Sequence, residues 1–125
     1  MTEYEVYNAI GEDGFRSLVA AFYKQIPADD ILGPMYATRD LTEAEDHLRD
    51  FLVFRFGGPP RYTETRGHPR LRMRHAPFAV NQAARDRWML LMNRALDQAS
   101  LSEEATAILR EFFATTATFL VNRSA

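Results

Sequence analysis

Cysteine is absent from this chain of 125 residues, which excludes disulfide bonds and thiolate metal sites. No secretory leader is expected, because the chain opens on the acidic run Met1-Thr2-Glu3-Tyr4-Glu5 instead of a basic and then apolar segment. No apolar run approaches the length of a membrane span. These absences predict a cytoplasmic protein that has no membrane partner.

Neither sign of charge is in large excess, since 15 basic and 17 acidic residues give a net charge of −2. This balance gives no reason to expect nucleic acid as a partner. The length suits one domain, residues 1–125, with a core of its own but without room for a second module.

Strand patterns are missing as well, because no stretch alternates polar and apolar residues for long enough. Apolar residues instead recur at three- and four-residue steps, which is typical of amphipathic helices. The fold class is therefore expected to be all-α. The spacing predicts four helices: one from Gly14-Phe15 to Pro27, one from Leu41-Thr42 to Gly57-Gly58-Pro59-Pro60, one capped by Asn81, and one beginning at Ser100 or Ser102.

The connecting segments are expected to be largely irregular. Thr42 and Glu45 have the spacing of a capping box for the second helix. A short turn of helix is expected through Ile31 and Leu32, capped by Ala28-Asp29-Asp30 and stopped by Gly33-Pro34. The remaining expectations are irregular structure at Met35-Tyr36, no clear periodicity over 61–66, and at most two helical turns between Pro69 and Pro77.

One short run concentrates positive charge and imidazole. Residues 66–75 contain four arginines and two of the three histidines of the chain. We interpret this run as a turn that binds an anionic group, with His75 as a metal ligand. The alternative from spacing alone is a loop imidazole that is hydrogen-bonded to a carbonyl.

The common catalytic motifs are not found. The chain has no Ser in a Gly-rich elbow, too few histidines for a zinc site, and no Gly-Lys-Ser/Thr continuation after Gly57-Gly58. Tyr23, Tyr36 and Trp88 lie on or beside apolar stripes, and each would bring a hydrogen-bond donor into the core. A flat apolar macrocycle with two carboxylates would explain the set, with His on its iron and arginines on its carboxylates.

Several motifs, in order and at matching spacing, resemble the truncated haemoglobins, and within them the second group. The match runs from about Tyr7 to Asn122. It is carried by Phe22-Tyr23, Met35-Tyr36, the helix of Leu48, Phe51 and Leu52 that ends in Gly57-Gly58-Pro59, Tyr62, the run from Gly67 to His75, and Arg85-Asp86-Arg87-Trp88.

The resemblance implies a two-over-two helical sandwich around haem b, with the iron on His75. It implies that Tyr23, Tyr36 and Trp88 line the distal side and donate hydrogen bonds to the ligand. Ala44 would occupy the place where many globins carry a distal His. The other residues expected to contact haem are His47 near a propionate, Leu48 over the iron, Phe51, Tyr62, Leu71, Arg72, Phe78, Val80 and Met92.

Some positions stay open on the sequence. Gly11 is followed by Glu12-Asp13 where the family's first hinge usually has a second Gly, which puts the packing of the first helix in question. Phe56 stands where relatives often have Trp, which puts only the lining of a tunnel or of the pocket in question. Arg72 and Arg74 are either propionate or carbonyl partners or solvated charges, and His68 is expected to be a turn residue or a propionate neighbour.

The resemblance implies binding of O₂, nitric oxide or similar small ligands, and the polar pocket favours redox chemistry such as nitric oxide dioxygenation or peroxidase-like turnover. Such turnover needs an external reductase, because the sequence has no flavin or nicotinamide motif. The alternatives are an O₂ carrier or store, a haem-based sensor, whose output domain is not in this sequence, and a haemless helical interaction protein. A monomer and a homodimer are both compatible with the sequence.

Overall fold

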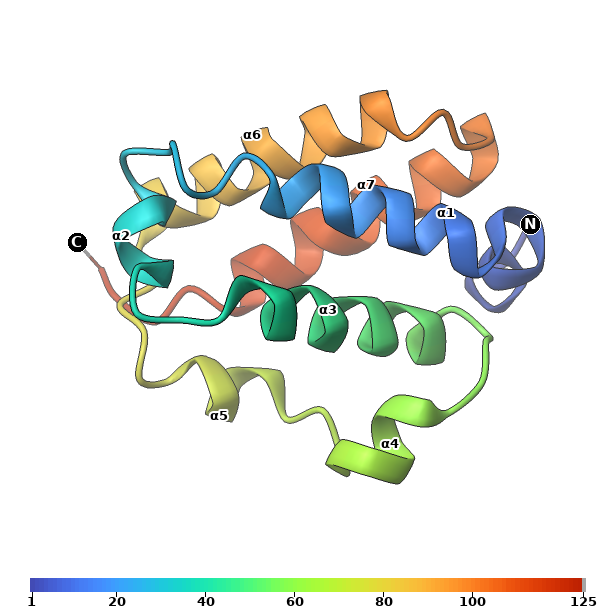
Figure 1. The fold of residues 1–125 in the computed structure, drawn as a ribbon, viewed down its shortest axis with the longest axis horizontal. Coiled ribbons are helices and arrows are strands. Elements are labelled where there is room, and N and C mark those ends of the chain that lie inside the picture. Colours follow the sequence, from blue (N-terminus) through green and yellow to red (C-terminus); the bar gives the residue numbers. More distant parts are fainter. Residues whose placement is uncertain (125) are drawn as a thin grey trace.

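Helices account for all regular structure in the computed structural model, which describes residues 1–124 and has no strand in that range (Figure 1). This confirms the all-α expectation. In chain order the elements are a 3₁₀ helix at Glu3–Glu5, α1 at Val6–Tyr23, α2 at Leu32–Tyr36, α3 at Leu41–Arg55, α4 at Arg61–Arg66, α5 at Leu71–His75, α6 at Gln82–Gln98 and α7 at Glu103–Phe119.

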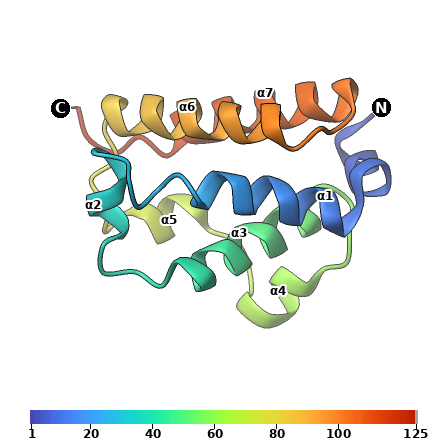
Figure 2. The same ribbon diagram turned by 45° about the horizontal axis from the view of Figure 1, so that its top comes forward.

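Two pairs of long helices make the body of the molecule. Helix α1 packs on α3, α6 packs on α7, and α1 also contacts α6. Figure 2 shows α6 and α7 as one layer above α1 and α3. Phe15, Phe22 and Phe56 are fully buried between these layers, and each such side chain contributes about 1.5–3 kcal/mol by its burial. The arrangement is the expected two-over-two sandwich.

Helix α1 begins at Val6 and not at Gly14. The apolar stripe starts only at Phe15, because a kink separates the first turns of the helix from the rest. The kink is at Gly11, whose φ of 70° lies in the left-handed region that glycine adopts without strain. Glu12 follows the kink, and its two carboxylate oxygens lie 2.6 and 2.8 Å from Nη2 of Arg61. Although the hinge has a single Gly, the ion pair of Glu12 with Arg61 therefore holds α1 against the start of α4.

The expectation that Gly33-Pro34 stops a helix is wrong, since both residues lie inside α2. N–H groups in the first turn of a helix have no intrahelical acceptor, so proline is tolerated there. The carboxylate of Asp29 accepts hydrogen bonds from the N–H groups of Ile31 at 3.1 Å and Leu32 at 2.7 Å. Tyr36 consequently ends a short helix and is not in irregular structure.

Side-chain caps fix where the later helices start. Asp40 caps α3, with Oδ1 2.9 Å from the N–H of Thr42, so the expectation of a Thr42 cap is wrong. The reason is that Thr42 already lies in the first turn of α3, where its N–H needs an acceptor. Asn81 caps α6 as predicted, and of the two candidates for α7 it is Ser102 that caps it.

The chain between α3 and α6 is made of short elements. Helix α3 ends at Arg55, which confirms the predicted break at Gly57-Gly58. Residues 61–66 form α4 although they lack periodicity, and α5 has the predicted length of at most two turns. Within residues 1–124, no helix has the length and apolar character needed to cross a bilayer.

Candidate functional site

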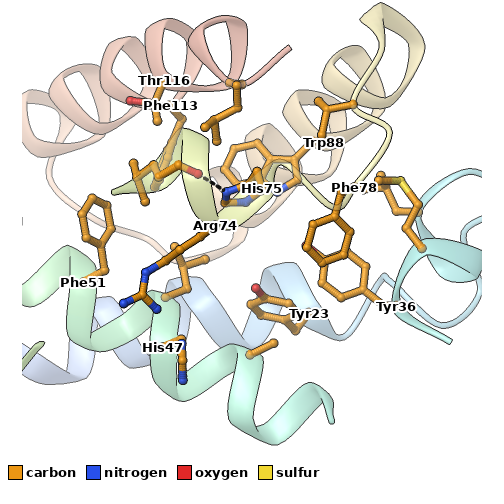
Figure 3. Close-up of a pocket in the computed structure, with 18 of the residues that line it drawn as sticks. Tyr23, Tyr36, His47, Phe51, Arg74, His75, Phe78, Trp88, Phe113 and Thr116 are labelled. Atoms are coloured by element: carbon orange, nitrogen blue, oxygen red, sulfur yellow. Dashed lines mark hydrogen bonds between the residues drawn. The ribbon is translucent and has the colours of Figure 1, made fainter. Parts of the chain in front are cut away.

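A cavity of about 530 Å³, open to solvent on one side, is lined by residues from all of the helices α1 to α7. Its volume is in the range of about 300–1,000 Å³ that small-molecule and cofactor sites occupy. Figure 3 shows side chains from distant parts of the sequence around this space. The predicted site residues that line it are Tyr23, Tyr36, His47, Leu48, Phe51, Tyr62, Leu71, His75, Phe78, Val80 and Trp88, and Ala44 lines it too.

His75 is the last residue of α5 and lines the cavity. Its Nδ1 lies 2.8 Å from the carbonyl oxygen of Leu71, one turn earlier on the same helix (Figure 3). Because a carbonyl only accepts, Nδ1 carries a proton, and the lone pair of the neutral ring is then on Nε2. Nε2 has no partner within residues 1–124. The sequence presented a carbonyl-bonded imidazole and a metal ligand as alternatives for His75. The two are compatible, because metal-binding histidines commonly donate their other N–H in this way.

His68 is held differently. It does not line the cavity, and its Nδ1 accepts a hydrogen bond from the backbone N–H of Arg70 at 3.2 Å. Arg70 has a φ of 45°, in the left-handed region, so this contact belongs to a tight turn before α5. Of the two histidines in the basic run, only His75 faces the cavity.

The aromatic wall consists of Tyr23, Tyr36 and Trp88, which α1, α2 and α6 bring together. The rings of Tyr23 and Tyr36 meet edge to face with centroids 6.0 Å apart. The indole of Trp88 packs on Phe22 at 4.9 Å and on Phe113 at 5.5 Å. Its N–H has no hydrogen-bond acceptor among the described residues, so it is available to a ligand in the cavity.

Both tyrosines of the aromatic wall stay protonated. Burial raises the pKa of Tyr23 well above its usual range, and the neighbouring Tyr36 raises it further. Burial also raises the pKa of Tyr36. Since indole does not titrate, all three side chains are neutral donors throughout the physiological pH range.

An ion pair ties two elements of the aromatic wall together. Nη1 of Arg87 lies 2.6 Å from Asp29 and 2.6 Å from Asp30. Burial alone would raise the pKa of Asp29, but hydrogen bonds from the Leu32 N–H and from Arg87 outweigh this and lower it. Asp29 thus caps α2 and also binds the residue that precedes Trp88. Sequence reasoning did not assign this link, because nothing in the spacing pairs residues 29 and 87.

Basic side chains also line the cavity. The guanidinium of Arg39 stacks 4.4 Å from the ring centre of Phe78, and Nη2 of Arg74 donates to the carbonyl of Arg66 at 3.0 Å. Neither arginine forms an ion pair within the described part of the chain, so both are available to carboxylates of a bound group. Arg39 could not be found from the sequence, because it lies in a connection without periodicity.

His47 lines the cavity from α3, where the structure gives it a half-exposed ring. Its Nε2 lies 3.6 Å from Glu43. Burial and the nearby Arg66 lower the pKa of His47, and Glu43 opposes them only in part. At neutral pH the ring is therefore uncharged.

Two expected haem contacts, Arg72 and Met92, fall outside the lining, and so does Phe56. Arg72 is one helical position away from the face that carries Leu71 and His75, and its guanidinium lies over Phe119 at 5.3 Å. Met92 is fully buried in the core, one turn of α6 beyond Trp88. Phe56, which was expected to affect only a tunnel or the pocket lining, is likewise a core residue that packs on Phe112 at 4.9 Å. Arg74, and not Arg72, faces the cavity.

Helix α7 contributes a wall that the list of expected haem contacts omitted. Helical spacing in the sequence predicts that Phe112, Phe113, Thr116 and Leu120 face inward, but spacing alone does not distinguish cavity from core. The α7 residues in the lining, together with Leu120, are Phe112, Phe113, Thr116 and Ala117.

The chemistry of the lining fits one type of cofactor. Among the described residues, no cluster of three or more His, Cys, Asp or Glu could hold a metal ion alone. A single imidazole with a free Nε2 in a largely apolar cavity suits a metal that a macrocycle already carries. The guanidinium groups of Arg39 and Arg74, which form no ion pair within residues 1–124, suit the carboxylates of such a macrocycle.

Comparison with known proteins shows the family of the chain. The model of the bacterial-like globin family matches residues 5–122. The chain is 38% identical over 118 residues to the group 2 truncated hemoglobin YjbI of Bacillus subtilis, covering 94% of this chain and 89% of that protein.

Solved structures give the same result. The hemoglobin of Chloroflexus aurantiacus superposes with a TM-score of 0.90 at 42% identity, over 94% of this chain and 98% of that one. The truncated oxygen-avid haemoglobin of Bacillus subtilis superposes with a TM-score of 0.88 at 38% identity, over 94% and 98% of the two chains.

Proposed function

Because this chain belongs to the bacterial-like globins, and within them to the group II truncated haemoglobins, we propose that it binds haem b through Nε2 of His75 and retains O₂ against the aromatic wall. The family implies haem-based binding of small gaseous ligands such as O₂. One observation carries the proposal for this chain. The free Nε2 of His75 lines the same cavity as three neutral hydrogen-bond donors.

When bound, haem would supply an iron that takes up a diatomic gas. The carbonyl of Leu71 orients the imidazole of His75 and increases the basicity of Nε2. Arg39 and Arg74 are proposed to bind the propionates, and His47 is proposed as a weaker, uncharged neighbour of one of them. Leu48 and Phe51 on α3 would cover the macrocycle.

The aromatic wall is proposed to slow ligand release. A diatomic ligand that gains negative charge on binding is stabilised by donors placed in advance around it. A hydrogen bond to a charged acceptor contributes about 1.5–3 kcal/mol, which corresponds to about tenfold to hundredfold slower release. The relative from Bacillus subtilis that is described as oxygen-avid supports this direction.

Slow release suits reaction of the retained gas better than transport. We therefore propose oxidation of nitric oxide as the activity, in which nitric oxide, O₂ and one electron give nitrate, and peroxidase-like turnover as the second candidate. The electron would come from an external reductase, because the sequence contains no flavin or nicotinamide motif. A cytoplasmic location would supply one, and the lack of cysteine is compatible with a reducing compartment. A monomer suffices for this chemistry, and a homodimer is equally compatible with it.

The test starts from the visible spectrum of the purified protein. We expect a Soret band in the ferric and ferrous states, a stable O₂ complex, and nitrate formed in a ratio of one to each haem oxidised when nitric oxide is added. A protein that stays colourless with added haem would support the haemless interaction protein. Fast O₂ release without nitrate formation would support a carrier or a sensor.

A further inference from the structure

Helix α5 carries the candidate iron ligand but has little packing of its own. It consists of the five residues Leu71–His75, and none of them is buried. A helix of this length is not stable in isolation, because one turn fixes more backbone angles than its few hydrogen bonds repay. Contacts outside α5 must therefore set the position of the His75 imidazole.

Asn122 supplies such contacts from beyond the end of α7. Its Oδ1 accepts a hydrogen bond from the N–H of Val80 at 2.9 Å. Its Nδ2 donates to the carbonyl of Phe78 at 3.0 Å and to the carbonyl of His75 itself at 3.2 Å. The backbone strengthens the link, since the N–H groups of Asn122 and Arg123 donate to the carbonyl of Val80 at 2.8 and 3.1 Å.

An asparagine side chain has the hydrogen-bonding groups that this position requires. A primary carboxamide combines an acceptor oxygen with two N–H donors, which is what one N–H and two carbonyl groups require. Aspartate at this position would keep the acceptor but lose both donors. Alanine would lose all three side-chain hydrogen bonds and leave the backbone contacts of the segment.

The three residues that Asn122 contacts are all part of the cavity wall. His75, Phe78 and Val80 line it, and the rings of His75 and Phe78 lie 6.0 Å apart. A displacement of residues 76–80 would therefore move the Phe78 ring against the imidazole and tilt the axis of Nε2.

The other end of this connection is firmly held. Arg85 on α6 donates to the hydroxyl of Thr118 and to the carbonyl of Ala114, both at 3.1 Å. These bonds fix the last turn of α7, from which the chain leads directly to Asn122. Through Asn122, the position of the 76–80 loop is thus fixed relative to the packed helices α6 and α7.

We propose that Asn122 is a positioning residue for the axial histidine. It joins the loop after His75 to the end of α7 and so sets the orientation of the imidazole toward the haem iron. The inference rests on His75 as the iron ligand in the proposed function. It adds that this ligand is aligned by a side chain from the carboxyl-terminal segment.

The experiment compares Asn122→Ala with Asn93→Ala as a matched control. Asn93 also accepts one hydrogen bond between helices, from Arg110 at 2.6 Å, but it lies outside the cavity lining and does not touch residues 75–80. In the ferrous protein without gas, resonance Raman spectroscopy measures the stretching band between the iron and the imidazole. We expect a shifted and broadened band in Asn122→Ala and an unchanged band in Asn93→Ala.

Haem retention gives a second readout. Transfer of haem to excess apomyoglobin should be about tenfold faster from Asn122→Ala than from the wild type, because more than one hydrogen bond of ordinary strength is lost. Asn122→Asp keeps the acceptor for Val80, so its Val80 amide should stay protected from hydrogen exchange while its Raman band moves. This variant carries the test if Asn122→Ala does not fold.

The outcomes separate this inference from the proposed function. A wild-type protein without an iron–imidazole band would contradict His75 as the ligand, and with it the proposed function. A wild-type band that neither Asn122 variant moves, together with haem transfer as slow as in Asn93→Ala, would overturn the inference about Asn122 alone.

Discussion

The two sides of the cavity differ in how the chain holds them. The aromatic wall, Tyr23, Tyr36 and Trp88, stands on α1, α2 and α6, packs on buried phenylalanines and is braced by the pair of Asp29 with Arg87. The histidine segment, residues 67–80, contains no buried residue. Figure 1 shows this segment, with the short helix α5, at the edge of the molecule next to α3.

The two sides should therefore differ in whether their folded conformation depends on bound haem. Regions with few buried apolar contacts open at low cost, while core helices open only with the whole fold. The aromatic wall should therefore be formed before haem binds. The histidine segment should depend on haem, on Asn122 and on its few other hydrogen bonds.

The largest effect is expected from His75→Ala, which removes the only imidazole of the histidine segment that faces the cavity. Stable haem uptake should be lost, because no other described residue of this segment offers a free ring nitrogen to the cavity. The Soret band after haem titration measures this. His68→Ala is the matched control, and it should bind haem normally because His68 belongs to a turn outside the cavity. A normal Soret band in His75→Ala would remove His75 as the ligand.

The next effect concerns the aromatic wall. Trp88→Phe removes a donor and keeps an aromatic ring against Phe22 and Phe113. O₂ release should become about tenfold to hundredfold faster, as expected for the loss of about 1.5–3 kcal/mol. Stopped-flow displacement of O₂ measures the rate. Tyr7→Phe, which removes a hydroxyl outside the cavity lining, should leave the rate unchanged. An unchanged rate in Trp88→Phe would mean that the indole does not bind the ligand.

Asp29→Ala tests how much the contacts that hold the aromatic wall contribute to the stability of the protein. The change removes the cap of α2 and the partner of Arg87 whose side chain is only 8% exposed, so the free energy of unfolding should fall by about 2 kcal/mol. Urea unfolding followed by circular dichroism measures it. Asp30→Ala loses a contact to the same arginine, but its side chain is 82% exposed, so the loss should stay below about 1 kcal/mol. Equal losses in both variants would contradict a special role of Asp29.

The smallest effect is expected from His47 on α3, and it concerns the dependence of stability on pH. Burial and Arg66 lower the pKa of His47, so the unfolded chain binds this proton more readily than the folded chain. Stability therefore falls as the pH drops below about 6.5, the pKa of the unfolded state. His47→Gln removes this contribution and should lose less stability between pH 7.5 and pH 5.5.

The difference should be well under about 1 kcal/mol, because the His47 side chain is 39% exposed and solvent screens its charge. Thermal unfolding of the haem-free protein at both pH values measures it, with His68→Gln as control. An acid loss in His47→Gln as large as that of the wild type would assign the pH dependence to other groups.

Sequence reasoning located the long helices and most of the lining, because helical spacing and the motif order carry that information. It missed α4, whose six residues are too few to show a period, and the helical state of Gly33-Pro34, because a proline in a first turn resembles a helix stop. It also chose Arg72 over Arg74, since the rotation of the short α5 depends on the turn at Arg70. The roles of Arg39, Asp29 and Asn122 depend on contacts between distant segments, which no local pattern encodes.

Hydrogen exchange of the protein with and without haem tests the central contrast most directly. We expect the amides of α1 and α6 around Tyr23 and Trp88 to be protected similarly in both states. We expect haem to increase the protection of residues 67–80 at least about tenfold, because it binds the folded segment and not the open one. Equal protection of residues 67–80 in both states, or an aromatic wall that becomes protected only with haem, would contradict the account.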